Sequence, residues 1–316
     1  MMKERKLISR KNAIVVLAAA LLMTAFLVDA AGTETVRPRI IIQSDGTISP
    51  DTAPIQRSGD TYTLTGNVFA EISVQRSNIT IDGAGYTLQG TYNGTNESAF
   101  IIGEGPDQVS DDVKVPYSIG IDLAFPQVTG LTVKNLNIKN YSIGMYIWTE
   151  NNKIAGNAIM DTIVGILLSG SNNSITRNYI ARNKQGIFFG WNEPGEIPST
   201  IEISHNWFDG NQQHLSGCLC EDYNFTELPH TWDDGKEGNY WADYNGTDID
   251  GDGIGDIPYI IDALNQDRYP LMESPVNPPT VASGFPVAVI AATAILLVLT
   301  AAVVLYKKRK TVHNAA

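Results

Sequence analysis

The 316-residue sequence is poor in cysteine and in basic residues, and both shortages exclude classes of protein. Two cysteines are too few for a small disulfide-rich scaffold, which relies on several bridges in place of a hydrophobic core. With 22 basic and 34 acidic residues the net charge is −12, which argues against a nucleic acid as partner. Between the two ends of the chain no stretch shows the apolar stripe of a surface helix, so an all-β fold is expected.

Long apolar runs occur near the two ends. Residues 13–28 form a run of 16 residues, all apolar except Thr24, after a basic segment, a pattern typical of a secretory signal peptide, with cleavage expected after Ala30. An uncleaved signal anchor is the alternative. Residues 285–306 are 22 uncharged residues followed by a basic cluster. They predict a transmembrane helix with a cytoplasmic tail at 307–316, rather than a GPI signal.

These segments place residues 31–273 outside the cell, followed by a Pro-rich stalk at 274–284. Five basic residues lie in the signal peptide and four in the tail, so the remainder keeps 13 basic and 32 acidic residues, a net charge of −19. This charge favours cations over anionic polymers. Seven Asn-x-Ser/Thr sequons predict N-glycosylation, although an Asn-rich repeat also raises their number. They begin at Asn78, Asn93, Asn96, Asn140, Asn172, Asn224 and Asn245.

A 21-residue repeat determines the expected fold. Gly144, Gly165 and Gly186 are 21 residues apart, and the apolar residues around them alternate with period two, as in β-strands. Two apolar rows keep this spacing, with one interval lengthened to 28: Val133, Ile154, Ile175 and Ile203, and Ile138, Ile159, Ile180 and Phe208. A β-sandwich would not give constant spacing, and the rows do not fit leucine-rich repeats. The sequence predicts a single right-handed parallel β-helix with coils of about 21 residues.

A β-helix needs a cap at each end, to cover the core of its terminal coil. We expect the N-terminal cap before the first clear coil at 79–88, and the C-terminal cap in the aromatic, acidic segment 218–272. A row of asparagines is also predicted to stack at one turn, because buried amides need hydrogen-bond partners. These are Asn135, Asn157, Asn178 and Asn206.

The repeat Gly-Ile-x-Leu with Asn-Asn-x-Ile-x-x-Asn-x-Ile resembles the NosD-like right-handed β-helices of exported proteins. The resemblance covers residues 40–272 and includes Ile-Asp-Gly-Ala-Gly at 81–85, Gly-Asn-Tyr-Trp-Ala-Asp-Tyr at 238–244 and Asp-Arg-Tyr-Pro-Leu-Met at 267–272. It implies the β-helix fold. The namesake serves copper-site maturation of nitrous oxide reductase, and the wider group includes carbohydrate-binding and sugar-hydrolase β-helices. Function does not follow from this, because β-helices host many chemistries.

Outward aromatic residues are the candidate ligand surface. Tyr146, Trp148, Phe188 and Trp191 could stack against sugar rings, unless a neighbouring loop covers them. No stacked pair of carboxylates occurs at the outward positions, so glycoside cleavage lacks its acid and base. We identify no catalytic residues.

Two metal sites are also considered. Cys218, Cys220 and His214 could bind a soft ion such as copper, but a disulfide or inert thiols are the alternative outside the cell. The loop 248–256 offers oxygen ligands at calcium-loop spacing, although a solvated Asp-Gly turn is the alternative and no Glu follows at position 12. Its candidate ligands are Asp248, Asp250, Asp252, Ile254 and Asp256.

We therefore expect a membrane-anchored extracellular β-helix that binds carbohydrate or a surface-layer component without catalysis. The alternatives are a periplasmic copper-binding maturation protein and a polysaccharide-cleaving enzyme. Calcium is the expected ion, and no nucleic acid is expected as partner.

Overall fold

The computed structural model describes residues 38–92, 118–190, 198–217 and 228–274. The predicted signal peptide, transmembrane helix and tail lie outside these ranges, as does the stalk apart from Ser274. The described residues form strands and turns, in agreement with the all-β prediction. None of the described segments forms an apolar helix of membrane-spanning length.

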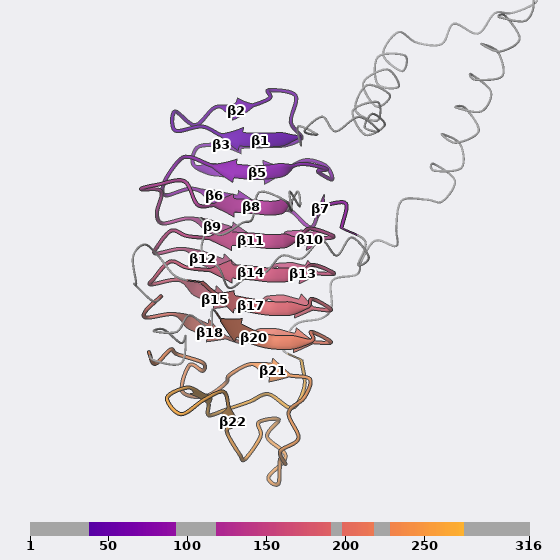
Figure 1. Cartoon of the computed structure of the whole chain (residues 1–316), viewed down its shortest axis with the longest axis vertical. Helices are drawn as coiled ribbons and strands as arrows, with labels where there is room; N and C mark the ends of the chain where they lie inside the picture. Colours follow the sequence, from indigo (N-terminus) through magenta and orange to yellow (C-terminus); the bar gives the residue numbers. More distant parts are fainter. Residues whose placement is uncertain (1–37, 93–117, 191–197, 218–227, 275–316) are drawn as a thin grey trace, which may run out of the picture. The chain divides into compact units, whose positions relative to one another are not determined.

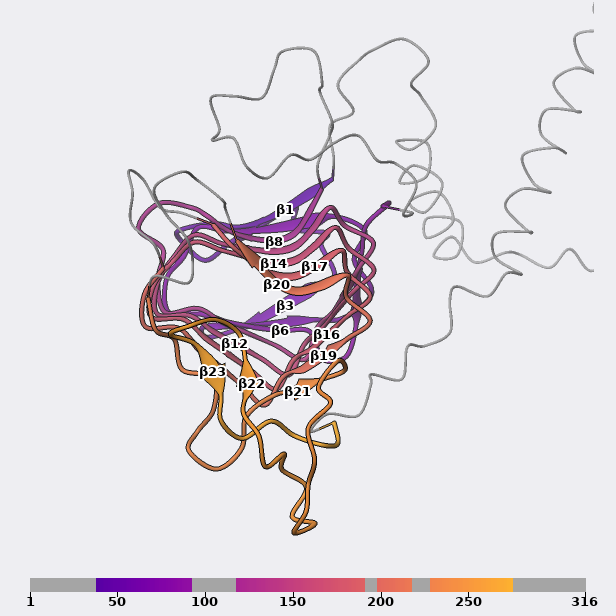
Figure 2. The same ribbon diagram turned by 60° about the horizontal axis from the view of Figure 1, so that its bottom comes forward.

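Equivalent strands of successive coils pair in parallel and form three sheets around one core, the arrangement of a parallel β-helix (Figures 1 and 2). Sheet A contains, in spatial order, β2 (Ile48–Ser49), β1 (Arg39–Ile42), β5 (Glu71–Val74), β8 (Ile119–Leu123), β11 (Ile143–Ile147), β14 (Val164–Leu168), β17 (Gln185–Phe189) and β20 (Gln213–Gly217). Sheet B contains β18 (Glu202–Ser204), β15 (Ser174–Thr176), β12 (Lys153–Ala155), β9 (Thr132–Lys134), β6 (Thr80–Asp82), β4 (Thr61–Leu64) and β3 (Ile55–Ser58). Sheet C contains β21 (Tyr240–Trp241), β19 (Trp207–Asp209), β16 (Tyr179–Ala181), β13 (Ala158–Met160), β10 (Asn137–Lys139) and β7 (Thr87–Gln89).

The predicted apolar rows are confirmed as register partners. Met145 pairs with Ile166 and Ile166 with Ile187 in sheet A. The rows that begin at Val133 and Ile138 run through sheets B and C in the predicted order, including the interval of 28 residues. All of these side chains are fully buried. Alternation therefore sends one face of each strand into a continuous core.

Left-handed residues turn the chain at the corners between the sheets. After sheet B, Gly156, Arg177 and His205 occupy one corner with φ of 67°, 56° and 57°. Gly and Asn adopt this conformation readily, whereas it strains larger residues such as Arg177 and His205. This explains why Asn and Gly recur between the predicted strands.

An asparagine ladder lies just inside this corner, with one correction to the prediction. The Oδ1 atoms of Asn178, Asn206 and Asn239 accept hydrogen bonds from the backbone N–H groups of Asn157, Asn178 and Asn206, at 2.9–3.0 Å. The prediction for Asn135 is wrong, because the residue 21 positions before Asn157 is Leu136, which donates its N–H to Asn157 Oδ1 at 3.1 Å. Asn135 itself is exposed on the corner, with φ of 55°.

Residues 228–274 close the C-terminal end of the core. Trp241 is 1% exposed and stacks between Phe208 and Tyr259, with ring centroids 4.5 and 4.4 Å away. Leu271 forms a parallel bridge with Tyr240, which adds a further rung to sheet C. The antiparallel pair β22 (Tyr259–Ile260) and β23 (Gln266–Asp267) completes this segment.

Candidate functional site

A hollow of about 610 Å³ opens where the chain turns from sheet A to sheet B. Its lining comes from equivalent segments of two successive coils, 124–129 and 146–150. The first segment begins where Asp122 Oδ1 accepts the Ala124 N–H at 3.0 Å, a turn that ends β8. The second continues from β11. A repeated corner thus places two loops side by side.

Two aromatic rings form the apolar part of the hollow. Tyr146 and Trp148 are half-buried and lie edge to face, with ring centroids 5.8 Å apart and an interplanar angle of 74°. They are two of the four residues predicted to form a ligand surface. The period of two in β11 sends Tyr146 outward, between the inward-facing Met145 and Ile147.

Polar groups line the rest of the hollow, and the sequence prediction did not include them. The side chains of Gln127 and Glu150 are exposed at its lining. Thr129 Oγ1 donates a hydrogen bond to the Glu150 carbonyl at 2.7 Å and accepts one from Asn151 Nδ2 at 3.2 Å, which ties the two coils together. The 24-residue offset between Ile119 and Ile143 could have identified 124–129 as the neighbouring loop.

The other two predicted surface aromatics have different surroundings. Phe188 is in register with Leu167, which is in register with Tyr146, as the repeat predicts. However, Phe188 is only 3% exposed and belongs to a buried cluster with Val164 and Ile143. It is not among the residues that line the hollow. Trp191 lies outside the described residues.

The acidic loop brings together three of its five predicted calcium ligands. Carboxylate oxygens of Asp248, Asp250 and Asp252 all lie within 4.8 Å of one another. The Gly253 and Gly251 N–H groups donate to the Asp248 carboxylate at 2.9 and 2.7 Å. These backbone hydrogen bonds lower the pKa of Asp248 and keep it ionised.

Asp256 is not part of this group of three, and Ile254, whose carbonyl is the predicted ligand, contacts the group through its N–H. Asp256 Oδ2 accepts the Ile249 N–H at 2.7 Å, and the Ile254 N–H donates to Asp252 Oδ1 at 2.8 Å. Asp243, another acidic residue of this segment, accepts a hydrogen bond from the Tyr259 hydroxyl at 3.1 Å. The loop therefore presents a compact group of three carboxylates.

Of the three predicted soft-metal residues, the structure describes His214. His214 Nε2 lies 3.3 Å from Asp243 Oδ1, and its ring is next to Phe208 and Trp241, with centroids 5.9 and 6.0 Å away. Burial lowers the pKa of His214. Cys218 and Cys220 lie outside the described residues.

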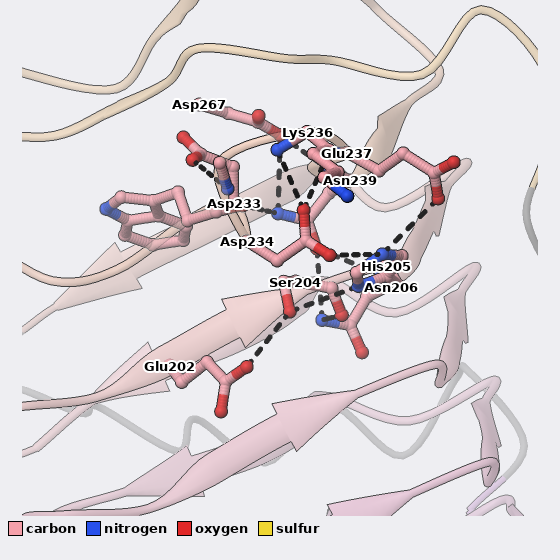
Figure 3. Close-up of polar contacts among 12 residues, drawn as sticks. Glu202, Ser204, His205, Asn206, Asp233, Asp234, Lys236, Glu237, Asn239 and Asp267 are labelled. Carbon is pink, nitrogen blue, oxygen red and sulfur yellow. Dashed lines mark hydrogen bonds and ion pairs between the residues drawn. The ribbon is translucent and has the colours of Figure 1, made fainter.

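A second histidine links the last coil to the C-terminal segment, a contact the sequence did not predict (Figure 3). His205 Nε2 lies 3.4 Å from Glu237 Oε2 and 3.6 Å from Asp234 Oδ2, and its Nδ1 is 3.2 Å from Ser204 Oγ. The Asp234 carboxylate also accepts the Glu237 N–H at 2.8 Å, and backbone hydrogen bonds lower its pKa. This network fixes the 233–237 loop against the corner at His205.

The half-buried imidazole of His230 makes no hydrogen bond, although the His230 backbone N–H donates to Asn265 Oδ1 at 2.8 Å. Its ring stacks on Phe189 at a centroid distance of 5.4 Å and an interplanar angle of 9°. Neither ring nitrogen has a hydrogen-bond partner, and burial lowers the pKa of His230 to about 4. The ring therefore packs as a neutral aromatic group at neutral pH.

The described sequons lie on the surface to different degrees. Asn78, Asn172 and Asn245 are exposed, and Asn140 is half-buried. The sequon at Asn172 combines this corner residue with Asn173, which is 1% exposed, so the repeat itself accounts for it. Asn93, Asn96 and Asn224 lie outside the described residues.

Comparison with known proteins identifies the family. A family model described as periplasmic copper-binding protein (NosD) matches residues 40–246, more than half of the chain. No curated protein matches the sequence. The matched span contains the stacked coils, the asparagine ladder up to Asn239, and the hollow. The chain therefore belongs to the NosD family, as the repeat predicts.

Proposed function

We propose that this protein is a membrane-anchored β-helix outside the cytoplasm that binds cell-surface carbohydrate, without cleaving it, in the hollow beside Tyr146 and Trp148. The periplasmic description of its family supports the location. Support for the anchor comes from the predicted signal peptide and the apolar segment 285–306. Surface-layer glycans are partners of suitable chemistry.

The hollow is the observation that carries this proposal. Ligand pockets typically measure about 300–1,000 Å³ and combine apolar walls with a few placed polar groups. Tyr146 and Trp148 offer apolar ring faces to the carbon side of a sugar. Gln127 and Glu150 offer an amide and a carboxylate that can hydrogen-bond sugar hydroxyls.

Cleavage is less well supported than binding. A glycosidase needs two carboxyl groups across the scissile bond, one of them with a raised pKa as the general acid. Glu150 is the one carboxylate among the lining residues of the hollow. Burial raises the pKa of Asp267, but this group is fully buried and cannot reach a polysaccharide. Asp234 and Glu237 flank His205, on a different corner.

Copper binding is the alternative that the family description suggests. Copper in proteins prefers imidazole, thiolate and thioether donors. Among the described residues, the group close enough to share an ion consists of carboxylates alone, those of Asp248, Asp250 and Asp252. These are hard oxygen donors, so this loop fits Ca²⁺ better than copper. We propose calcium as the ion for the 248–256 loop, in a structural role.

A glycan-array screen of the detergent-solubilised full-length chain tests the proposed function. Wild type should bind a subset of glycans, and the double variant Tyr146→Ala with Trp148→Ala should lose that binding. Tyr86→Ala is the matched control, since this aromatic residue is 38% exposed and lies outside both segments that line the hollow. Absence of binding by wild type, or its retention in the double variant, would refute the proposal. Release of cut products from a bound glycan would favour the enzyme alternative.

A further inference from the structure

The charge of the hollow narrows the class of sugar that fits it. Glu150 lines the hollow and its side chain is exposed. Among the described residues, none that lines the hollow is a lysine, arginine or histidine. A bound sugar therefore meets a negative charge with no positive charge beside it.

A second carboxylate lies next to the hollow on the outward face of sheet A. Asp122 is the register partner of Tyr146, and it alternates with the inward-facing Ile121 and Leu123. Its Oδ1 accepts the Ala124 N–H at 3.0 Å, and its Oδ2 accepts the Ser73 hydroxyl at 3.4 Å. These contacts hold the Asp122 carboxylate beside the Tyr146 ring, so negative charge flanks the aromatic pair.

The basic residues of the same coils do not offset this charge at the hollow. Arg76 Nη2 lies 2.8 Å from Asp60 Oδ1, and Lys134 Nζ lies 3.2 Å from Asp82 Oδ2. Lys153 begins β12, past the corner, and is not among the lining residues. The hollow thus lacks the cation that recognition of an acidic sugar requires.

The two rings at the hollow also favour a cation. Tyr146 and Trp148 meet at 74° instead of stacking, so the ring whose edge makes the contact keeps both faces uncovered by the other. An aromatic face carries negative partial charge and attracts ammonium groups, tryptophan most strongly. Aromatic faces together with a carboxylate are the groups that recognise an ammonium ion.

We infer that the hollow selects sugars that carry a protonated amine, such as glucosamine, over N-acetylated sugars and uronic acids. The inference rests on the proposed function, since it names the class of sugar bound at the same site. The ammonium group lies between the Glu150 carboxylate and an aromatic face. A uronic acid would instead bring its own carboxylate towards Glu150 and Asp122. The net charge of −12 also attracts cationic sugars at longer range.

Isothermal titration of the detergent-solubilised full-length chain with three tetrasaccharides tests this preference. They are oligomers of glucosamine, of N-acetylglucosamine and of galacturonic acid. At pH 6 and moderate ionic strength the amine is protonated and the uronic acid is ionised. The glucosamine oligomer should bind at least about tenfold more tightly than its N-acetylated counterpart, and the galacturonic acid oligomer should bind most weakly.

Glu150→Gln removes the charge at the hollow and keeps the size of the side chain. It should bring the ratio of the glucosamine and N-acetylglucosamine affinities close to one, chiefly by weakening glucosamine binding. Glu273→Gln makes the same change at an exposed position of the C-terminal segment and is the matched control. This control should keep the wild-type ratio, because it lowers the net charge equally.

Three results would overturn the inference. One is binding of the N-acetylated or uronic acid oligomer as tight as that of the glucosamine oligomer. Another is a preference that persists in Glu150→Gln, because the net charge of the chain would then explain it. The third is binding of none of the three oligomers by a chain that binds other glycans on the array. Carbohydrate binding itself would stand in each case, whereas an array without any bound glycan would remove both proposals.

Discussion

The Asp267 carboxylate ends the asparagine ladder one rung beyond Asn239. Its Oδ2 accepts the Asn239 N–H at 2.7 Å and the Trp241 Nε1–H at 2.9 Å, and its Oδ1 accepts the Tyr269 N–H at 3.1 Å. A Cβ atom at residue 238 would collide with this carboxylate, so glycine is required there. The motifs at 238–244 and 267–272, far apart in sequence, thus meet at the end of the core.

Removal of this carboxylate should destabilise the whole C-terminal end. Asp267→Ala leaves buried donors of Asn239 and Trp241 unpaired, which should lower the free energy of unfolding by about 2–5 kcal/mol. Urea unfolding followed by circular dichroism at pH 7 measures this. Glu273→Ala changes an exposed residue nearby and should stay within about 0.5 kcal/mol of wild type. A similarly small effect for Asp267→Ala would show that the ladder does not need this last rung.

The core of the coils can be tested at Leu168. This side chain is fully buried in register with Ile147 and Phe189. Leu168→Asp buries an unpaired carboxylate at a cost of several kcal/mol, and each coil depends on its neighbours, so several coils should unfold together. Hydrogen exchange measured by mass spectrometry should show lost protection over more than one coil. Loss of protection confined to β14, or a melting temperature equal to that of wild type, would contradict the register. Lys153→Asp changes an exposed residue and is the control, which should keep wild-type protection.

The buried imidazole of His230 should make stability pH-dependent. Its pKa is about 4 in the folded protein, below the ordinary value of 6.5, because burial disfavours the charged ring. Between pH 6.5 and 4 the unfolded chain takes up a proton that the folded chain does not, so stability falls as the pH falls. The loss should reach about 1–3 kcal/mol at pH 4, less where water reaches the ring.

His230→Phe keeps the stacking on Phe189 and removes the titration. The difference in unfolding free energy between variant and wild type should therefore move in favour of the variant as the pH falls from 7 to 4. A difference that stays constant with pH would show that His230 is not held neutral by burial.

Calcium should stabilise the loop at 248–256. The three carboxylates of Asp248, Asp250 and Asp252 repel one another, and a bound Ca²⁺ would offset their charge. Chelation should lower the melting temperature of the full-length chain at moderate ionic strength. Asp250→Ala combined with Asp252→Ala should abolish the difference between calcium and chelator. Equal melting of wild type with and without calcium would reject the site.

The coils were predictable because a fixed spacing of inward side chains constrains every strand in the same way. The register from Val133 to Ile203 follows directly from the sequence. The residues at the corners are harder to predict. A shift of one residue in the alignment moves a residue from a buried position in the ladder to an exposed position with left-handed backbone conformation. This is why Asn135 was misplaced and Leu136 occupies the position. Asn239 was missed because an irregular interval of 33 residues separates it from Asn206, and Asp267 was missed because it is reached only through Asn239 and is not an asparagine.

The candidate site was predictable only in part. Alternation in β11 identified Tyr146 as outward, and Trp148 lies next to it. Gln127 and Thr129 come from the preceding coil. The loop that carries them differs in length and sequence from the equivalent loop after β11, so the repeat did not align the two loops. Burial of Phe188 depends on packing that a single strand pattern does not contain. Contacts such as that between His205 and Glu237 join a repeat to a non-repeating segment, where periodicity gives no information.

The most direct test of the account is the affinity of the hollow for the glycan identified on the array. Isothermal titration of the full-length chain should give a Kd that rises at least about tenfold in Trp148→Ala, the loss of roughly 1.4 kcal/mol of contact energy. Tyr86→Ala, outside the hollow, should bind as wild type does. Equal affinities of wild type and Trp148→Ala would contradict the assignment of carbohydrate binding to this hollow.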